Sequence, residues 1–195
     1  MLVVEDDEIV EEYDEFIDIE ENLDSNIINL TGITNEMLVD QGVYEDVVAD
    51  DLKERLTPGT LMVAHNCQFD LSFVYMLLKR HFPEEACEIV NGVDWFDTLT
   101  ILKDRKKFPH KLSDAVEYCE IDKDIQYHRA IDDTKALYYV TEELKRRDND
   151  LYEYKNLFGF NPKYGVSGIR FNFIKYKPQK FSYIEPLPKE KRLYS

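Results

Sequence analysis

The chain contains few cysteines and no long hydrophobic run. Its three cysteines, Cys67, Cys87 and Cys119, are odd in number and form no CxxC pair, so neither a disulfide framework nor a zinc cluster is indicated. No apolar stretch approaches the roughly 18 residues that span a membrane, and the acidic N-terminus lacks the basic start and apolar core of a signal peptide. These absences predict a reducing, cytoplasmic setting without membrane contact.

Basic residues are the minority. The chain has 24 Lys and Arg against 40 Asp and Glu, which gives a net charge of −16. Because nucleic-acid phosphates favour Lys and Arg, this balance weakens nonspecific binding to nucleic acid. The excess of acids lies in the body, since residues 150–195 carry nine Lys/Arg against four Asp/Glu. An enzyme that binds only the end of a nucleic-acid strand, through metal ions, would need no broad basic face.

Glycine and proline are also scarce, at seven each among 195 residues, and 44% of residues are apolar. We expect one globular domain over residues 1–147 and a basic aromatic extension over residues 148–195. Between residues 170 and 183, aromatic and basic residues alternate. This pattern suits stacking on single-stranded bases, and it equally suits an arm that packs on the domain or on a partner protein.

A strand that gives way to a helix is predicted around residues 61–78. Residues 61–64 (LMVA) read as a buried strand, and residues 71–78 carry apolar residues at helical spacing. Asp70 therefore lies at the carboxyl end of a strand, where open α/β sheets collect functional side chains. Alternatively, Asp70 caps the helix that starts near Leu71. We expect His65 to be structural.

A second candidate segment spans residues 128–133 (HRAIDD). An apolar stripe at helical spacing follows it, so His128 is expected in a loop and Asp133 in the first turns of a helix. A loop histidine and two carboxylates suit the activation of water at a divalent metal. A surface histidine and an ordinary first-turn acid are the alternative.

Elsewhere the sequence predicts an N-terminal hairpin from residues 2–4 and 9–17, and a strand end followed by a helix at residues 95–99. Asp97 or Thr98 is expected to cap that helix. A further helix is expected over residues 43–56. Its expected inner face comprises Val47, Val48, Leu52 and Leu56.

Four segments together resemble the DEDDh-type 3′–5′ exonucleases, the family of the proofreading (epsilon) subunit and of the exonuclease domain of Gram-positive DNA polymerase III. They are residues 30–34 (LTGIT), 64–70 (AHNCQFD), 96–99 (FDTL) and 128–133 (HRAIDD). The resemblance implies an RNase H-like α/β fold, with a mixed sheet flanked by helices. It also implies hydrolysis of a 3′-terminal phosphodiester with two divalent metals, Mg²⁺ or Mn²⁺.

Carried over by position, the resemblance makes Asp70 and Asp133 metal ligands and His128 the general base. These three residues would form the catalytic set. The residues that would bind the terminal nucleotide are Thr31, Gly32, Ile33, Asn66 and Phe69.

The family's first motif, a strand that ends in Asp-x-Glu, has no counterpart before Leu2. Two of the four metal-site acids are therefore absent, and Asp70 with Asp133 would hold at most one ion loosely. Without that central strand, the sheet either keeps unpaired edges or pairs in a new register. We therefore expect a truncated or mis-started exonuclease, a broken gene, or a strand supplied by a separate polypeptide.

The function expected from the resemblance is metal-dependent removal of nucleotides from single-stranded DNA 3′ ends, of the proofreading type. Because two of the metal-site acids are absent, we do not expect efficient hydrolysis by the chain as given. The alternative is a noncatalytic, degenerate nuclease module that docks on nucleic acid or on a replication protein such as a DNA polymerase, with the C-terminal extension as its contact. RNA as the substrate is a further alternative, because a pocket for one or two nucleotides tells sugars apart by small contacts.

Overall fold

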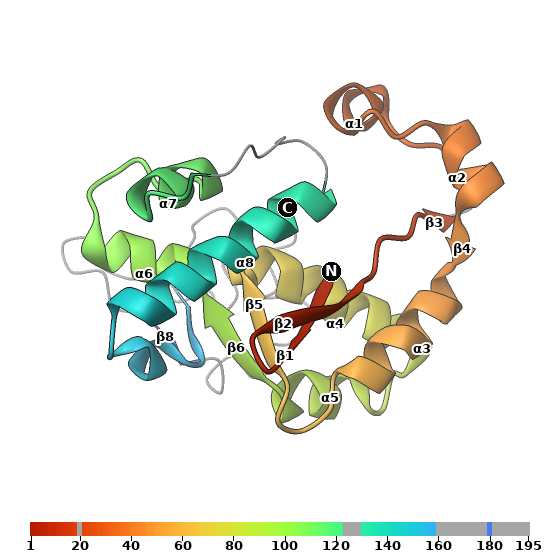
Figure 1. The fold of residues 1–195 in the computed structure, drawn as a ribbon. Coiled ribbons are helices and arrows are strands. Elements are labelled where there is room, and N and C mark those ends of the chain that lie inside the picture. Colours follow the sequence, from red (N-terminus) through yellow and green to blue (C-terminus); the bar gives the residue numbers. More distant parts are fainter. Residues whose placement is uncertain (19–20, 123–129, 159–178, 181–195) are drawn as a thin grey trace.

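The computed structural model describes residues 1–18, 21–122, 130–158 and 179–180, in which strands and helices are interspersed (Figure 1). The strands are β1 (Leu2–Glu5), β2 (Glu8–Glu12), β3 (Ile17–Asp18), β4 (Val43–Tyr44), β5 (Leu61–Ala64), β6 (Asp94–Asp97), β7 (Leu157–Phe158) and β8 (Gln179–Lys180). The helices are α1 (Ser25–Thr31), α2 (Asn35–Gln41), α3 (Glu45–Arg55), α4 (Cys67–His81), α5 (Ala86–Gly92), α6 (Thr98–Arg105), α7 (Leu112–Tyr118), α8 (Ala130–Arg147) and the 3₁₀ helix η1 (Leu151–Tyr154). The expected α/β class is confirmed.

The parallel pair β5–β6 forms the centre of the body. Met62 pairs with Trp95, and Val63 pairs with Phe96. Because successive side chains of a strand point to opposite faces, Met62 and Trp95 face one side and Val63 and Phe96 face the other. Figure 1 shows α8 crossing in front of this pair and α4 lying behind it.

Each face of the pair has its own hydrophobic core. The first face packs against α4 and α5, and its buried residues are Leu56, Ala64, Cys67, Leu71, Leu78, Ala86, Val90, Val93 and Trp95. The second face packs against α6, α7 and α8, and its buried residues are Phe96, Ile101, Leu102, Ala115, Val116, Cys119, Ala136, Val140, Leu144, Leu151 and Tyr154. The apolar stripe predicted for α8 thus lies in the second core.

The N-terminal hairpin forms as expected from β1 and β2, with Leu2 opposite Glu12. Its second strand ends at Glu12 and not near Ile17, which instead belongs to β3 and pairs in parallel with β4. Among the described residues the strands form four separate pairs, and the hairpin does not pair with β5. Without the family's central strand we expected either unpaired strand edges or pairing in a new register, and the described strands keep unpaired edges.

Helix α3 lies within the range predicted for it, but its inner face differs from the prediction at one residue. Val48 is buried, and so is Leu56 just after the helix, whereas Val47 is 46% exposed. Neighbouring helical residues are about 100° apart around the axis, so Val47 and Val48 cannot both face the core fully. The prediction for Val47 was therefore wrong.

The chain continues to pack against the body after α8. Leu151 and Tyr154 of η1 belong to the second core. The backbone N–H of Asn156 donates to the carbonyl of Trp95 at 2.8 Å, and the Asn156 side chain accepts from the Trp95 N–H at 2.8 Å. Residues 151–156, which we expected in the extension, thus pack on the body, and Asn156 bonds directly to β6. Most of the extension, residues 159–178 and 181–195, lies outside the described residues.

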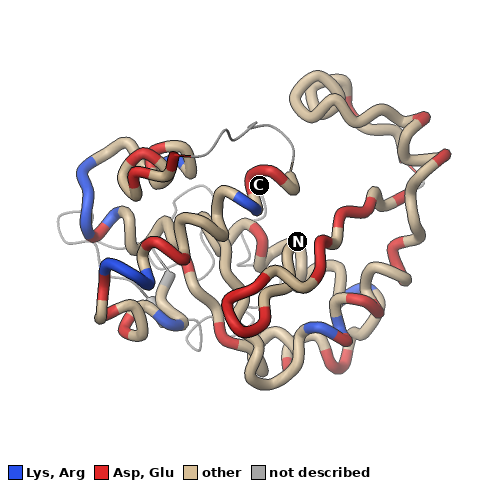
Figure 2. Tube along the Cα trace, in the orientation of Figure 1, with Lys and Arg blue, Asp and Glu red and all other residues tan. Residues whose placement is uncertain are grey.

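Acidic residues line the N-terminal hairpin, and basic residues gather mainly at α6 and the C-terminal end of α8 (Figure 2). None of the described helices combines the length and the hydropathy of a membrane span.

Gly42 follows α2 in a place where a side chain does not fit. A Cβ there would lie 2.9 Å from the backbone nitrogen of Asp18 and still closer to the carbonyl oxygen of Leu38. We expect Gly42→Ala to lower the free energy of unfolding by about 1–3 kcal/mol, because backbone atoms would have to move. Urea denaturation followed by circular dichroism measures this.

Gly92 at the end of α5 is the matched control, since a Cβ there would meet nothing within 4 Å. Gly92→Ala should be neutral, or stabilising by up to about 1 kcal/mol through helix propensity. Equal losses for the two variants would contradict the packing described for Gly42.

Candidate active site

The turn between β5 and α4 places Asp70. Helix α4 begins at Cys67, four residues earlier than expected, and Asn66 before it adopts the left-handed conformation with φ 76° and ψ 53°. Asparagine tolerates this conformation better than most residues. Asp70 is consequently the fourth residue of the helix and not its cap, so the capping alternative for Asp70 was wrong.

Asp97, at the end of β6, holds this turn in place. Its Oδ1 accepts hydrogen bonds from the backbone N–H groups of Asn66 at 2.9 Å, Cys67 at 3.3 Å and Leu99 at 3.1 Å. Its Oδ2 accepts from the Thr100 hydroxyl at 2.8 Å. Asp97 is only 2% exposed, so these donors replace the water that its carboxylate loses. One buried side chain thus fixes the starts of both α4 and α6.

His65 lies beside this carboxylate and is structural, as expected. Its Nε2 is 2.9 Å from the carbonyl oxygen of His110, which can only accept, so Nε2 carries a proton. Burial lowers the pKa of His65, which favours the neutral ring. Nδ1 lies 3.0 Å from the Thr98 hydroxyl, whose single proton is shared between this nitrogen and the carbonyl oxygen of Ala64 at 3.2 Å. The ring therefore ties the end of β5 to α6 and to the loop before α7.

Asp70 combines access to solvent with partial desolvation. Its side chain reaches the surface, yet the protein atoms packed on its inner side reduce its hydration. This desolvation and the negative charge of Asp97 raise the pKa of Asp70 to about 6, against the lowering effect of its backbone hydrogen bond. An accessible carboxylate with a raised pKa is typical of functional sites.

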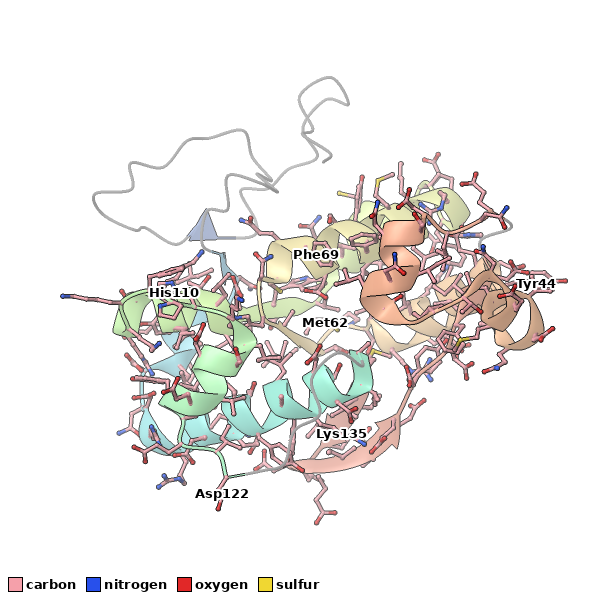
Figure 3. All side chains as sticks on the ribbon, turned by 90° about the horizontal axis from the view of Figure 1, so that it is seen from above. Tyr44, Met62, Phe69, His110, Asp122 and Lys135 are labelled. Atoms are coloured by element: carbon pink, nitrogen blue, oxygen red, sulfur yellow. The ribbon has the colours of Figure 1, made fainter. Side chains whose placement is uncertain are left out.

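The remaining members of the predicted catalytic set lie apart from Asp70 or outside the described residues. Asp133 is in the first turn of α8, on the opposite face of the β5–β6 pair from α4. Figure 3 shows Met62 of β5 between Phe69 on α4 and Lys135 on α8. His128 lies outside the described residues.

The donors among the described residues do not fit a two-metal centre. In this part of the chain no group of three or more His, Cys, Asp or Glu side chains is placed to hold a metal ion. Two cations at close range need several anionic oxygens to offset their repulsion. Asp70 has the right ligand chemistry for Mg²⁺ or Mn²⁺, but the described residues supply too few carboxylates around it.

The structure does not bring the predicted nucleotide pocket together. Asn66 and Phe69 adjoin Asp70, whereas Thr31 ends α1, a helix that buries none of its residues. Figure 1 shows α1 at the outer end of an arm, apart from α4. Gly32 is the left-handed C-cap of α1, with φ 73°, and its N–H donates to the carbonyl of Ile28. Ile33 follows this cap, also away from α4.

Sequence reasoning missed two features of the site. Asp97 was correctly predicted as a cap of α6, but its bonds to the start of α4 span about 30 residues and have no local signal. Phe73 was also missed, although its spacing of four from Phe69 on a helix places both rings on one side. The two ring centroids are 4.8 Å apart.

The Asp97 network predicts unequal effects of two substitutions. Asp97→Ala removes all four accepted bonds in a buried site, and we expect it to lower the free energy of unfolding by roughly 3–5 kcal/mol. Asp97→Asn keeps one acceptor oxygen, and its amide can donate to Thr100, so its loss should be roughly half as large. Chemical denaturation measures both. Equal, small losses would contradict the role given to Asp97.

The raised pKa of Asp70 predicts a pH-dependent stability. The folded state keeps the proton up to about pH 6, whereas the unfolded carboxyl loses it near 3.8, so the contribution of Asp70 to stability falls as pH rises between these values. Asp70→Asn should therefore raise Tm by on the order of 2 °C at pH 7, and not at pH 4. Thermal melts in a chelator measure this. A lower Tm for the variant at pH 7 would contradict the raised pKa.

Comparison with known proteins supports one family. A model of the exonuclease family RNase T matches residues 1–141. The chain is 32% identical over 140 residues to the 3′-5′ exonuclease DinG of Bacillus subtilis, covering 69% of this chain and 14% of DinG. It is 34% identical over 137 residues to the PolC-type DNA polymerase III of the same organism, covering 68% of this chain and 9% of that protein.

The PolC-type DNA polymerase III of Staphylococcus aureus is 32% identical over 151 residues, covering 76% of this chain and 10% of that protein. The chain thus spans about a tenth of the length of these relatives. The mixed α/β arrangement agrees with an RNase H-like exonuclease fold. Since the family match covers most of the chain, including Asp70 and Asp133, the chain belongs to the exonuclease (RNase T) family.

Proposed function

We propose that this chain serves in metal-dependent 3′–5′ removal of nucleotides from single-stranded DNA ends, as in proofreading during replication. The observation that carries the proposal is the accessible Asp70 carboxylate with its raised pKa, next to Phe69 on a helix whose start is fixed by Asp97. This segment lies within the match to the exonuclease family. The similarity to PolC-type polymerases supports a replication setting, which would be cytoplasmic.

In this proposal the carboxylates of Asp70 and Asp133 would hold Mg²⁺ or Mn²⁺, and His128 would accept a proton from a water molecule. A divalent metal would supply charge stabilisation and a more acidic water. Because the described carboxylates do not form a two-metal centre, further oxygen ligands have to come from the substrate or from residues outside the described set. The proposal therefore includes weak activity for the chain by itself.

The terminal nucleotide would contact Asn66 and Phe69 directly. Thr31, Gly32 and Ile33 would join them only if the arm that carries α1 moved toward α4, since Figure 1 shows the two apart. The C-terminal extension, beyond the packed residues 151–156, would contact DNA or a replication protein such as a polymerase. RNA remains an alternative polymer for the same site.

A noncatalytic docking module is the second candidate function. The observation that favours it is the lack, among the described residues, of a carboxylate cluster around Asp70. In that case the family fold would be retained for binding, and metal would not be needed.

Metal binding separates the two functions. Calorimetry with Mn²⁺ should show an affinity that increases as pH rises through about 6, because Asp70 must lose its proton to bind the ion. Asp70→Asn and Asp133→Asn should each weaken binding about tenfold or more. Asp132→Asn, which changes the neighbouring acid on the same turn of α8, should leave the affinity unchanged.

Digestion of a 3′-labelled oligonucleotide with Mn²⁺ is the accompanying measurement. We expect slow hydrolysis, which Asp70→Asn should abolish. A chain extended by sequence encoded upstream in the same reading frame should hydrolyse faster if that sequence adds acidic residues to the site. If neither Asp70→Asn nor Asp133→Asn changes Mn²⁺ binding and no hydrolysis occurs, the docking function replaces the catalytic one.

A further inference from the structure

Most of the positive charge in the described part of the chain is neutralised by ion pairs. The paired lysines and arginines are Lys53, Arg55, Arg80, Arg105, Lys135, Lys145, Arg146, Arg147 and Lys155. The connection between α6 and α7 differs, because Lys106, Lys107 and Lys111 form no ion pair with any described residue. Figure 2 shows basic residues along this connection, at the outer edge of the body and well apart from the acidic hairpin. A chain with a net charge of −16 thus keeps three neighbouring cations available.

Phe108 lies among these lysines and is left in solvent. It is 85% exposed, and its ring meets that of His110 edge-on, with the centroids 5.9 Å apart. A single exposed apolar residue is common on protein surfaces, so Phe108 alone would indicate nothing. Its place between Lys107 and Lys111, however, combines an apolar anchor with positive charge, and aromatic residues are enriched at protein interfaces. We call Lys106, Lys107, Phe108 and Lys111 the basic loop.

Hydrogen bonds hold the basic loop in one shape. Nζ of Lys106 donates to the carbonyl of Pro109 at 3.1 Å, and Nε2 of His110 donates to the carbonyl of Lys106 at 2.8 Å. The carbonyl of His110 in turn accepts from His65, at the end of β5, at 2.9 Å. The loop is therefore attached to the central strand pair. A partner does not have to order it, which lowers the free-energy cost of association.

The charges around the basic loop favour a short acidic peptide over a nucleic-acid strand. The exposed acids Asp104 and Glu117 lie on the two flanking helices, α6 and α7. A nucleic-acid strand carries a phosphate at every nucleotide, so beyond the loop it meets these acids and the rest of the acidic body. A short acidic peptide places its carboxylates only opposite the lysines, which is the complementarity that makes an interface specific.

We propose that the basic loop is a docking site for an acidic segment of another protein, in which carboxylates flank an apolar side chain. Lys106, Lys107 and Lys111 pair with the carboxylates, and the ring of Phe108 packs against the apolar side chain. This contact is separate from the C-terminal extension. It does not depend on hydrolysis at Asp70, and it serves either of the two candidate functions.

Fluorescence anisotropy of a short fluorescein-labelled peptide, in which aspartates alternate with leucines, tests the docking site. We expect Phe108→Ala and Lys107→Glu each to weaken binding roughly tenfold, because the first removes the aromatic anchor and the second opposes like charges. The affinity should fall as the salt concentration rises. Peptides with asparagine in place of aspartate, or serine in place of leucine, should also bind more weakly. Unchanged peptide affinity in both variants, or no binding to the unsubstituted chain, would overturn the proposal.

Lys79→Glu and Tyr44→Ala are the matched controls. Lys79, in the last turn of α4, likewise forms no ion pair with the described residues, and Tyr44 is 65% exposed. Figure 3 shows Tyr44 on the opposite side of the molecule from His110. Both controls should leave peptide binding unchanged. Equal losses for Lys79→Glu and Lys107→Glu would overturn the proposal, since the effect would then come from net charge and not from the loop.

Two other occupants of the basic loop are distinguished with the same variants. If the peptide does not bind, but oligothymidylate binds in EDTA and loses affinity in Lys107→Glu and Phe108→Ala, the loop is a nucleic-acid contact and the proposal is overturned. It is likewise overturned if the peptide does not bind and analytical ultracentrifugation shows self-association that Lys107→Glu abolishes. No hydrolysis enters these measurements, so the docking site and the proposed hydrolysis stand or fail separately.

Discussion

The buried carboxylate of Asp97 is the contact on which the candidate site depends. It closes the end of β6, caps α6 and accepts N–H groups from the first residues of α4. Removing a carboxylate from water is costly unless hydrogen bonds replace its hydration. The four donors around Asp97 meet that requirement, and in doing so they fix the left-handed Asn66 and the direction in which α4 leaves the sheet. Asp70 reaches solvent because of this arrangement.

The same arrangement explains why two acids with related chemistry have different environments. Asp97 accepts four hydrogen bonds. Asp70 accepts a backbone hydrogen bond that offsets only part of its desolvation, and it lies close enough to Asp97 for that charge to raise its pKa further. A nearby cation would relieve both effects at once. In a chain with a net charge of −16, such a site attracts cations. It repels phosphates unless a bound cation neutralises its charge or an apolar contact offsets the repulsion. The proposed metal ion represents the first of these two forms of compensation.

The division of the strands into pairs limits how the site can work. The β5–β6 pair has a hydrophobic core on each face, and these cores separate α4 from α8. The helices that carry Asp70 and Asp133 therefore lie on different sides of the pair. The arm with α1 and α2 makes few contacts with the body and leaves Leu30 and Val39 exposed, so the packing of the described residues does not fix the arm near Asp70.

The sequence by itself determined the elements whose signals are local: the hairpin at the N-terminus, β5 and β6, the cap at Asp97 and the buried stripe of α8. Their periodicity and capping act within a few residues. Only the tertiary structure decided that α4 starts at Cys67, that Phe73 is left in solvent, and that Asn156 bonds to Trp95. Each of these depends on groups far apart in the chain, because a buried donor or acceptor takes whichever partner the packing brings to it.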